Sequence, residues 1–201
     1  MPTRRGLIKK TLGGAALLAA AGAVPLALRK TKLRELNGRV LQFFTPAEYA
    51  VFAAVADRVL AIAPAGLEAD AAQQLKDAPT ASQVDVAGKA DAFLAPLPPA
   101  DAKELKQLLA LFDNALFSLA TGGPPTPFTQ QTAAQQDAHL RSWATSRLAV
   151  RRTGYQALKR LSAAIYFGSP ESWRSADYQG PPDVSAVRAA LSAAQGGGVR
   201  P

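Results

Sequence analysis

The stretch that decides the fold class is DAKELKQLLALFDNALFSL, residues 101–119. Its apolar side chains recur at intervals of three or four residues, which is the spacing of one face of an α-helix. Asp101 and Glu104 add negative charge near its start, where the helix dipole favours acidic side chains. We therefore predict one continuous helix with an apolar stripe facing the core. The stripe is formed by Leu105, Leu108, Leu109, Phe112, Leu116 and Leu119.

The composition extends this prediction to the whole chain. The 201 residues include 43 Ala and 25 Leu, against only 14 Val and Ile together. Ala and Leu are strong helix formers, whereas Val and Ile favour strands. A chain of this length usually forms one domain, or one domain and a tail. We therefore expect an all-α fold in the form of a small helical domain.

Further helices are predicted on both sides of this stretch. Thr45 and Glu48 form a capping box around Pro46, which is typical of a helix start. The helix that follows is expected to end near residues 63–66, where Pro and Gly interrupt the pattern. Residues 130–167 are expected to form two helices that break around residues 145–146. A helix over residues 82–94 is expected to turn four side chains inward: Val86, Ala90, Phe93 and Leu94.

The formal charge of +8 lies entirely in the first 39 residues. This segment holds nine basic side chains and one acidic side chain, whereas residues 40–201 hold 14 of each sign. The body is therefore neutral, which argues against nucleic acid as a partner. We expect a leader and its flank over residues 1–39, a helical domain over 40–182, and a short helix with a flexible tail over 183–201.

The leader has the features of an export signal. Residues 1–10 carry four positive charges and residues 11–28 carry no charge, which is the order of an n-region and an h-region. The n-region contains two consecutive arginines, an apolar pair and a lysine, and so resembles the twin-arginine signal. These residues are Arg4, Arg5, Leu7, Ile8 and Lys9. The alternative is an ordinary transmembrane or buried N-terminal helix that the arginines orient.

A twin-arginine signal helix in front of the domain predicts export to the periplasm by the twin-arginine translocase. That route carries folded proteins, often ones that load a cofactor before export. Small residues offer Ala-x-Ala cleavage sites at 19–21 and 21–23, but both sites lie inside the apolar stretch. The leader is therefore either removed or kept as an anchor at the inner membrane.

The chain offers few groups for redox or catalytic chemistry. It has no cysteine and one histidine, which excludes iron–sulfur ligation by Cys, thiolate zinc sites and haem attachment through Cys-x-x-Cys-His. His139 lies in a polar helical stretch and is expected to be solvated. The sequence contains no glycine-rich phosphate loop. We therefore expect no cofactor, no metal and no catalytic residue in this chain.

One segment of the body is locally basic. No acid occurs between Asp137 and Glu171, where six basic side chains lie. In one continuous helix, Arg147 and Arg151 would point toward the apolar face. Since a buried unpaired charge is costly, either the helix breaks near Ser146 or these arginines meet carboxylates inside the domain or on a partner.

Arginine beside aromatic residues is typical of protein interfaces. We therefore predict a partner surface made of two groups of residues. The first group is Trp143, Arg147, Arg151, Arg152 and Tyr155, and the second is Trp173 and Tyr178. The alternatives are a solvated basic face with one internal pair, and a C-terminal segment that Trp173 and Tyr178 hold against the domain's own core.

Motifs spread over the chain carry a family resemblance. They are TPAE (45–48), ADRVL (56–60), LPPAD (97–101), LRSW (140–143) with SRL (146–148), YQALK (155–159), YFGSP (166–170), Trp173 and YQGP (178–181). Together they resemble subunit 3 of gluconate 2-dehydrogenase, the small subunit of that complex. The likeness runs from the leader to about residue 182, and residues 143–181 are its most specific part.

The resemblance implies an accessory role. In that family a small subunit exported by the twin-arginine route accompanies a flavin-containing dehydrogenase of the glucose–methanol–choline oxidoreductase type. Electrons then pass to a multihaem cytochrome c or another acceptor. The resemblance thus implies FAD in a partner chain, with haem c or an iron–sulfur cluster elsewhere in the complex. Three hypotheses follow: a permanent accessory subunit, a transient export and folding chaperone, and an independent periplasmic enzyme or binding protein.

Overall fold

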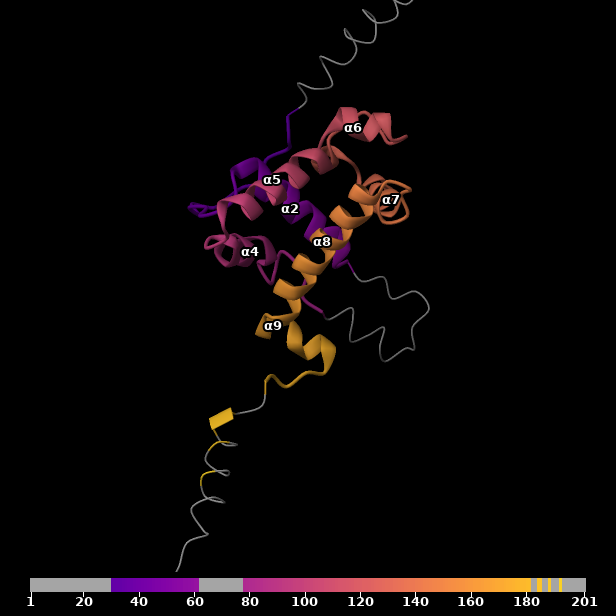
Figure 1. The fold of residues 1–201 in the computed structure, drawn as a ribbon. Helices are drawn as coiled ribbons and strands as arrows, with labels where there is room; N and C mark the ends of the chain where they lie inside the picture. The colour runs from indigo at the N-terminus through magenta and orange to yellow at the C-terminus, as the bar shows by residue number, and fades with distance from the viewer. Residues whose placement is uncertain (1–29, 62–77, 182–183, 186–187, 189–191, 193–201) are drawn as a thin grey trace, which may run out of the picture.

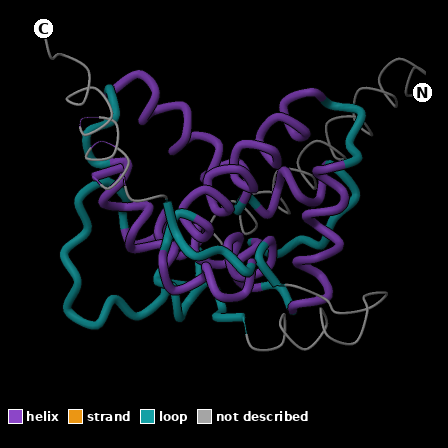
Figure 2. The backbone as a smooth tube through the Cα atoms, turned by 90° about the horizontal axis from the view of Figure 1, so that it is seen from below, coloured by secondary structure: helices purple, strands orange, loops and turns teal. Residues whose placement is uncertain are grey.

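The computed structural model describes residues 30–61, 78–181, 184–185, 188 and 192. Helices and loops account for these residues, and they contain no strand (Figure 2). The expected all-α class is therefore confirmed for the described part of the chain. The signal residues and most of the C-terminal tail lie outside it. Among the described helices, none has the length and apolar character needed to cross a membrane.

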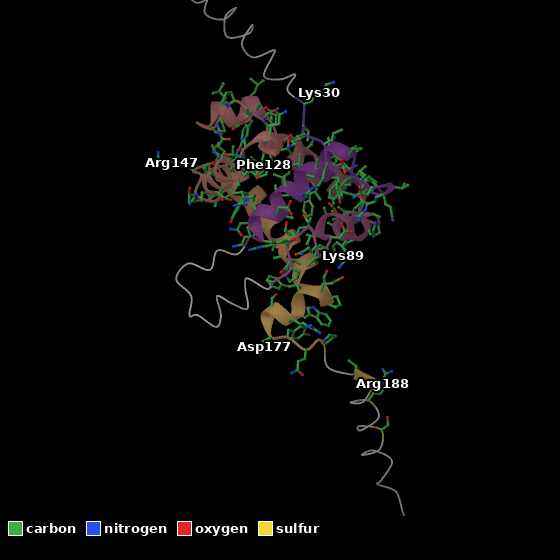
Figure 3. All side chains as sticks on the ribbon, turned by 180° about the vertical axis from the view of Figure 1, so that it is seen from behind. Lys30, Lys89, Phe128, Arg147, Asp177 and Arg188 are labelled. Atoms are coloured by element: carbon green, nitrogen blue, oxygen red, sulfur yellow. The ribbon has the colours of Figure 1, made fainter. Side chains whose placement is uncertain are left out.

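The helix α2 (Pro46–Val59) lies at the centre of the fold. It packs against α4, α5, α7 and α8, with α8 crossing in front of it in Figure 1. Lys30 and Asp177 lie at opposite ends of the helical body (Figure 3). The other elements are α4 (Val86–Leu94), α5 (Pro99–Phe112), α6 (Ala115–Ala120), η1 (Phe128–Gln130), α7 (Ala133–Ala144), α8 (Ala149–Phe167), α9 (Pro170–Trp173) and η2 (Arg174–Ala176).

The predicted start of α2 is confirmed in atomic detail. The Thr45 side chain accepts a hydrogen bond from the Glu48 backbone N–H at 3.3 Å, and Glu48 Oε2 accepts one from the Thr45 N–H at 2.8 Å. This capping box provides acceptors for two of the backbone N–H groups that have no hydrogen-bond partner within the helix. The helix ends earlier than expected, at Val59. Its Phe52 and Val55 are completely buried, so α2 supplies the middle of the core.

The helix expected over residues 101–119 is two helices. The α5 helix stops at Phe112, and α6 starts at Ala115 with Asn114 as its N-cap. The Asn114 side chain accepts a hydrogen bond from the Phe117 N–H at 2.9 Å, which stabilises a new start. Because the break changes the phase of the helix, Leu119 of the predicted stripe is exposed. The prediction of one continuous core helix is therefore wrong.

The α4 helix corrects a second prediction. It begins at Val86 rather than near residue 82, and Phe93 is exposed rather than turned inward. Asp91 is buried instead, and its carboxylate accepts three backbone hydrogen bonds. The donors are the N–H groups of Gln42 (2.7 Å), Phe43 (3.0 Å) and Phe44 (2.8 Å). The Asp91 carboxylate thus fastens the segment before α2 to the core.

Candidate functional site

Trp143, predicted at a partner surface, lies in the core. Its side chain has 0% exposure, and its ring contacts the rings of Phe112 (4.6 Å between centroids) and His139 (6.0 Å). The interface prediction is therefore wrong for Trp143. Its neighbour Leu140 is also buried and lies on the same face of α7. Burial of this face against α5 and α8 explains why the indole is not available to a partner.

Arg151 is also buried, with 6% exposure, so the interface prediction is wrong for this residue too. Its guanidinium lies over the rings of Trp143 (5.3 Å) and Phe117 (6.0 Å), and Nη2 donates to Ser142 Oγ at 2.7 Å. Arg151 forms no ion pair with an acid in the described part of the chain. Burial lowers the pKa of Arg151. Of the two alternatives, the helix break is therefore the one observed, and Arg151 meets aromatic faces rather than a carboxylate of the described residues.

His139 is not solvated as expected, because its imidazole is only 5% exposed. Its ring packs against Phe112 (4.9 Å between centroids) and Phe128 (5.3 Å). Burial, together with the positive charge of Arg151, lowers the pKa of His139 to about 4. The signal that sequence reasoning missed is spacing: His139 lies four residues before Trp143, on the same helical face.

The buried imidazole predicts a loss of stability in acid. In the unfolded chain His139 binds a proton below its ordinary pKa of 6.5. In the folded chain it binds that proton only below about pH 4. The free energy of unfolding should therefore fall as pH decreases from about 6.5 to about 4, by about 3 kcal/mol in total. Urea unfolding at pH 7 and pH 4.5 measures the loss. His139→Gln should lose less stability over the same range, and equal losses in both proteins would contradict the assignment.

The corner between α7 and α8 is the exposed part of the predicted first group. The break expected around residues 145–146 is confirmed there, because α7 ends at Ala144 and α8 begins at Ala149. Arg147 projects at the edge of the molecule (Figure 3). Two exposed apolar side chains that sequence reasoning missed, Leu148 and Val150, lie beside it in the chain. We call Arg147, Leu148 and Val150 the α7–α8 corner.

The remaining residues of the first group have different surroundings. Arg152 is exposed, and its Nη1 donates to the carbonyl oxygens of Ser146 (2.6 Å) and Arg147 (3.0 Å). It therefore stabilises the turn between α7 and α8. Tyr155 is half-buried and packs against the core. Of the five residues predicted together, only Arg147 and Arg152 are thus largely available to solvent.

The second predicted group, Trp173 and Tyr178, packs within the C-terminal segment. The Trp173 and Tyr178 rings meet edge to face at 5.3 Å, and Trp173 Nε1 donates to the Phe167 carbonyl at 2.9 Å. Gly180 has φ +102°, and a Cβ there would come within 2.8 Å of the Trp173 ring. Trp173 is thus half-buried against its own chain, while Tyr178 remains 47% exposed. Tyr178 is the member of this pair with the larger surface for a partner.

The flank of the leader is attached to the folded body. Thr31 Oγ1 donates to the Asp113 carboxylate at 2.7 Å, and the Lys32 N–H donates to Thr129 Oγ1 at 3.1 Å. Gln130 Nε2 donates to the Lys30 carbonyl at 2.5 Å. Burial raises the pKa of Asp113, and the hydrogen bonds from Thr129 and Thr31 oppose that rise. Residues 30–32 thus lie against η1 and the break between α5 and α6.

Among the described residues, no group of three or more His, Cys, Asp or Glu side chains could hold a metal ion. Comparison with known protein families, with curated proteins and with solved structures finds no match to this chain. The function is therefore inferred from the residues of the chain itself and from the family that its motifs resemble.

Proposed function

We propose that this chain is a non-catalytic small subunit of a flavin-dependent dehydrogenase similar to gluconate 2-dehydrogenase. It would carry the twin-arginine signal that takes the folded flavoprotein to the periplasm, and it would aid the maturation or stability of the complex. FAD would bind in the flavoprotein, and haem c or an iron–sulfur cluster would belong to other parts of the complex. The twin-arginine translocase is the second partner, and a cytochrome c subunit is the third.

The observation that carries the proposal is the attachment of the leader's flank to the body. Residues 30–32 follow the signal residues Arg4–Lys9 and hydrogen-bond to Asp113, Thr129 and Gln130. A flank that is hydrogen-bonded to a folded domain suits a route that carries folded proteins. The resemblance adds that the cargo is a dehydrogenase. A body with neither cysteine nor an acidic metal cluster among its described residues suits an accessory role.

The α7–α8 corner is the best candidate surface for the flavoprotein. It combines a guanidinium, a group that interfaces favour, with two exposed apolar side chains that a partner could bury. It also lies within residues 143–181, where the family resemblance is most specific. Tyr178 adds an exposed aromatic ring in the same part of the sequence.

Co-purification tests the proposal. The tagged chain is expressed in its own organism, and any flavin dehydrogenase bound to it is isolated separately from periplasm and cytoplasm. A stoichiometric periplasmic complex is the expected result. A complex found only in the cytoplasm would favour the transient chaperone, and dehydrogenase activity in the isolated chain with a flavin-linked dye would favour an independent enzyme.

A charge reversal at the corner should weaken this complex. Arg147→Glu places a negative charge beside Leu148, and we expect the dissociation constant to rise by about tenfold or more, which is about 1.4 kcal/mol. The matched control is Lys159→Glu, which makes the same charge change on an exposed residue of α8. Circular dichroism should show the same helix content in both variants. An equal effect of both would rule out the corner as the interface.

A further inference from the structure

The helix α8 has one side on the core and one side in solvent. It packs against α2, α4 and α7, and it lies at the front of the helical body in Figure 1. Three of its basic side chains, Arg152, Lys159 and Arg160, are exposed. At about 100° per residue, these three positions fall within about 100° of arc around the helix axis. They therefore lie on one face of α8.

The charge on this face is of one sign. Its arc also contains the exposed residues Gln156 and Phe167, and no acid occurs in the chain between Asp137 and Glu171. From Arg152 to Phe167 the face extends for about 22 Å, at about 1.5 Å per residue. We call it the outer face of α8 and define it by Arg152, Gln156, Lys159, Arg160 and Phe167.

The cations of the outer face are not paired with acids of the described residues. Arg152 donates to two backbone carbonyl oxygens, and none of the three cations forms an ion pair with a described acid. Five basic side chains elsewhere in the described part do form such pairs. Residues 138–170 hold six basic side chains and no acidic one, whereas the remainder of residues 40–201 holds eight basic and 14 acidic. A body that is neutral overall thus presents a segregated positive strip along α8.

Two further observations favour a lipid surface as the occupant of this strip. Basic side chains at a membrane are attracted by anionic headgroups, and aromatic rings are enriched at the headgroup level. Phe167 is 51% exposed on the same face as the three cations. In addition, only Arg29 separates the uncharged stretch 11–28 from Lys30, whose carbonyl accepts the hydrogen bond from Gln130. Any contact of that apolar stretch with a membrane would therefore hold the body close to the lipid.

We propose that the outer face of α8 binds the surface of a membrane that contains anionic phospholipids. The guanidinium and ammonium groups contact lipid phosphates, and the Phe167 ring enters the headgroup region. Val150 of the α7–α8 corner lies about 160° from Arg152 around the helix axis. The corner therefore points away from the lipid and stays accessible to a protein partner. The binding needs no residue of the dehydrogenase, so the isolated chain should show it.

A fluorescent label at one known position tests which face meets the lipid. The basic leader is itself attracted to anionic lipid, so binding of the full chain alone is not informative. The chain has no cysteine, so Gln156→Cys places one environment-sensitive label on the outer face, and Gln107→Cys places the matched control on an exposed position of α5. With vesicles of phosphatidylglycerol and phosphatidylcholine in equal parts, the label at position 156 should shift to the blue and brighten. The label at position 107 should not respond, and neither should respond to phosphatidylcholine alone.

Charge reversal on the face should remove this response. Lys159→Glu with Arg160→Glu changes two exposed side chains, and we expect it to reduce the response at position 156 by about fivefold or more. Circular dichroism should show unchanged helix content. Raising the salt concentration from about 0.1 M to about 1 M, which shortens the screening length from about 10 Å to about 3 Å, should also reduce the response. Equal responses at both positions, or a response that the double variant retains, would overturn the proposal. A chain that sediments with the vesicles while position 156 stays in water would overturn it too, and would favour an acidic protein as the partner of this face.

Discussion

Replacing Arg4 and Arg5 with lysine is expected to leave both this chain and its flavoprotein in the cytoplasm. The translocase reads the two guanidinium groups, and lysine keeps the charge but lacks their planar, multiple-donor geometry. In the proposed function the flavoprotein has no signal of its own, so it would be retained with its subunit. Fractionation followed by immunoblotting of both chains, and dye-linked dehydrogenase activity in the periplasm, measure the result.

The matched control for this experiment is Arg29→Lys, which makes the same exchange after the apolar stretch. It should leave the export of both chains unchanged. If the Arg4→Lys/Arg5→Lys chain is retained while the flavoprotein still reaches the periplasm, the flavoprotein does not depend on this signal. If the double variant itself is exported, the leader is not a twin-arginine signal. The two failures are therefore distinguishable.

Asp91→Ala is expected to destabilise the body by about 3–5 kcal/mol. The Asp91 carboxylate accepts hydrogen bonds from three consecutive backbone N–H groups, those of residues 42–44. The Phe43 and Phe44 donors are buried, so water cannot replace the lost oxygen atoms without opening the core. Urea unfolding followed by circular dichroism gives the change in the free energy of unfolding.

Two controls support the interpretation of this experiment. Asp91→Asn keeps one carbonyl oxygen and should lose less stability than Asp91→Ala. Asp101→Ala removes an exposed acid from the first turn of α5 and should cost less than about 1 kcal/mol. If Asp91→Ala were no more harmful than Asp101→Ala, the carboxylate would not be what holds residues 42–44 in place.

The sequence predicts those parts of the fold that depend on local signals. The capping box of Thr45 and Glu48 gives the start of α2, and the polar residues 145–146 give the break between α7 and α8. The break after Phe112 was missed because the apolar spacing continues through it. There, the buried Asp113 bonds to Thr129, far along the chain, and Asn114 restarts the helix. The local cap at Asn114 and the contact between Asp113 and Thr129 together select this break over continuation.

The candidate site was harder to predict for a similar reason. Arginine near tryptophan is compatible with an interface and equally with a cation stacked inside a core. Whether the arginine lies at the surface or in the core depends on which side of α8 faces α7 after the break. Residue spacing does not determine that orientation. The observed orientation turns Arg151 inward onto Trp143 and leaves Arg147 outside. Periodicity on α7 could have placed His139 in the core, since Leu140 and Trp143 share its face.

The hydrogen bonds that hold residues 30–32 also bear on the order of folding. They join partners 82, 97 and 100 positions apart in the sequence. Contacts of such separation carry a large loop-closure entropy, so they form late, after the helices between them have assembled. Residues 30–32 are therefore expected to be among the last parts of the body to become ordered. Protection of their backbone N–H groups from hydrogen exchange would mark the completion of folding.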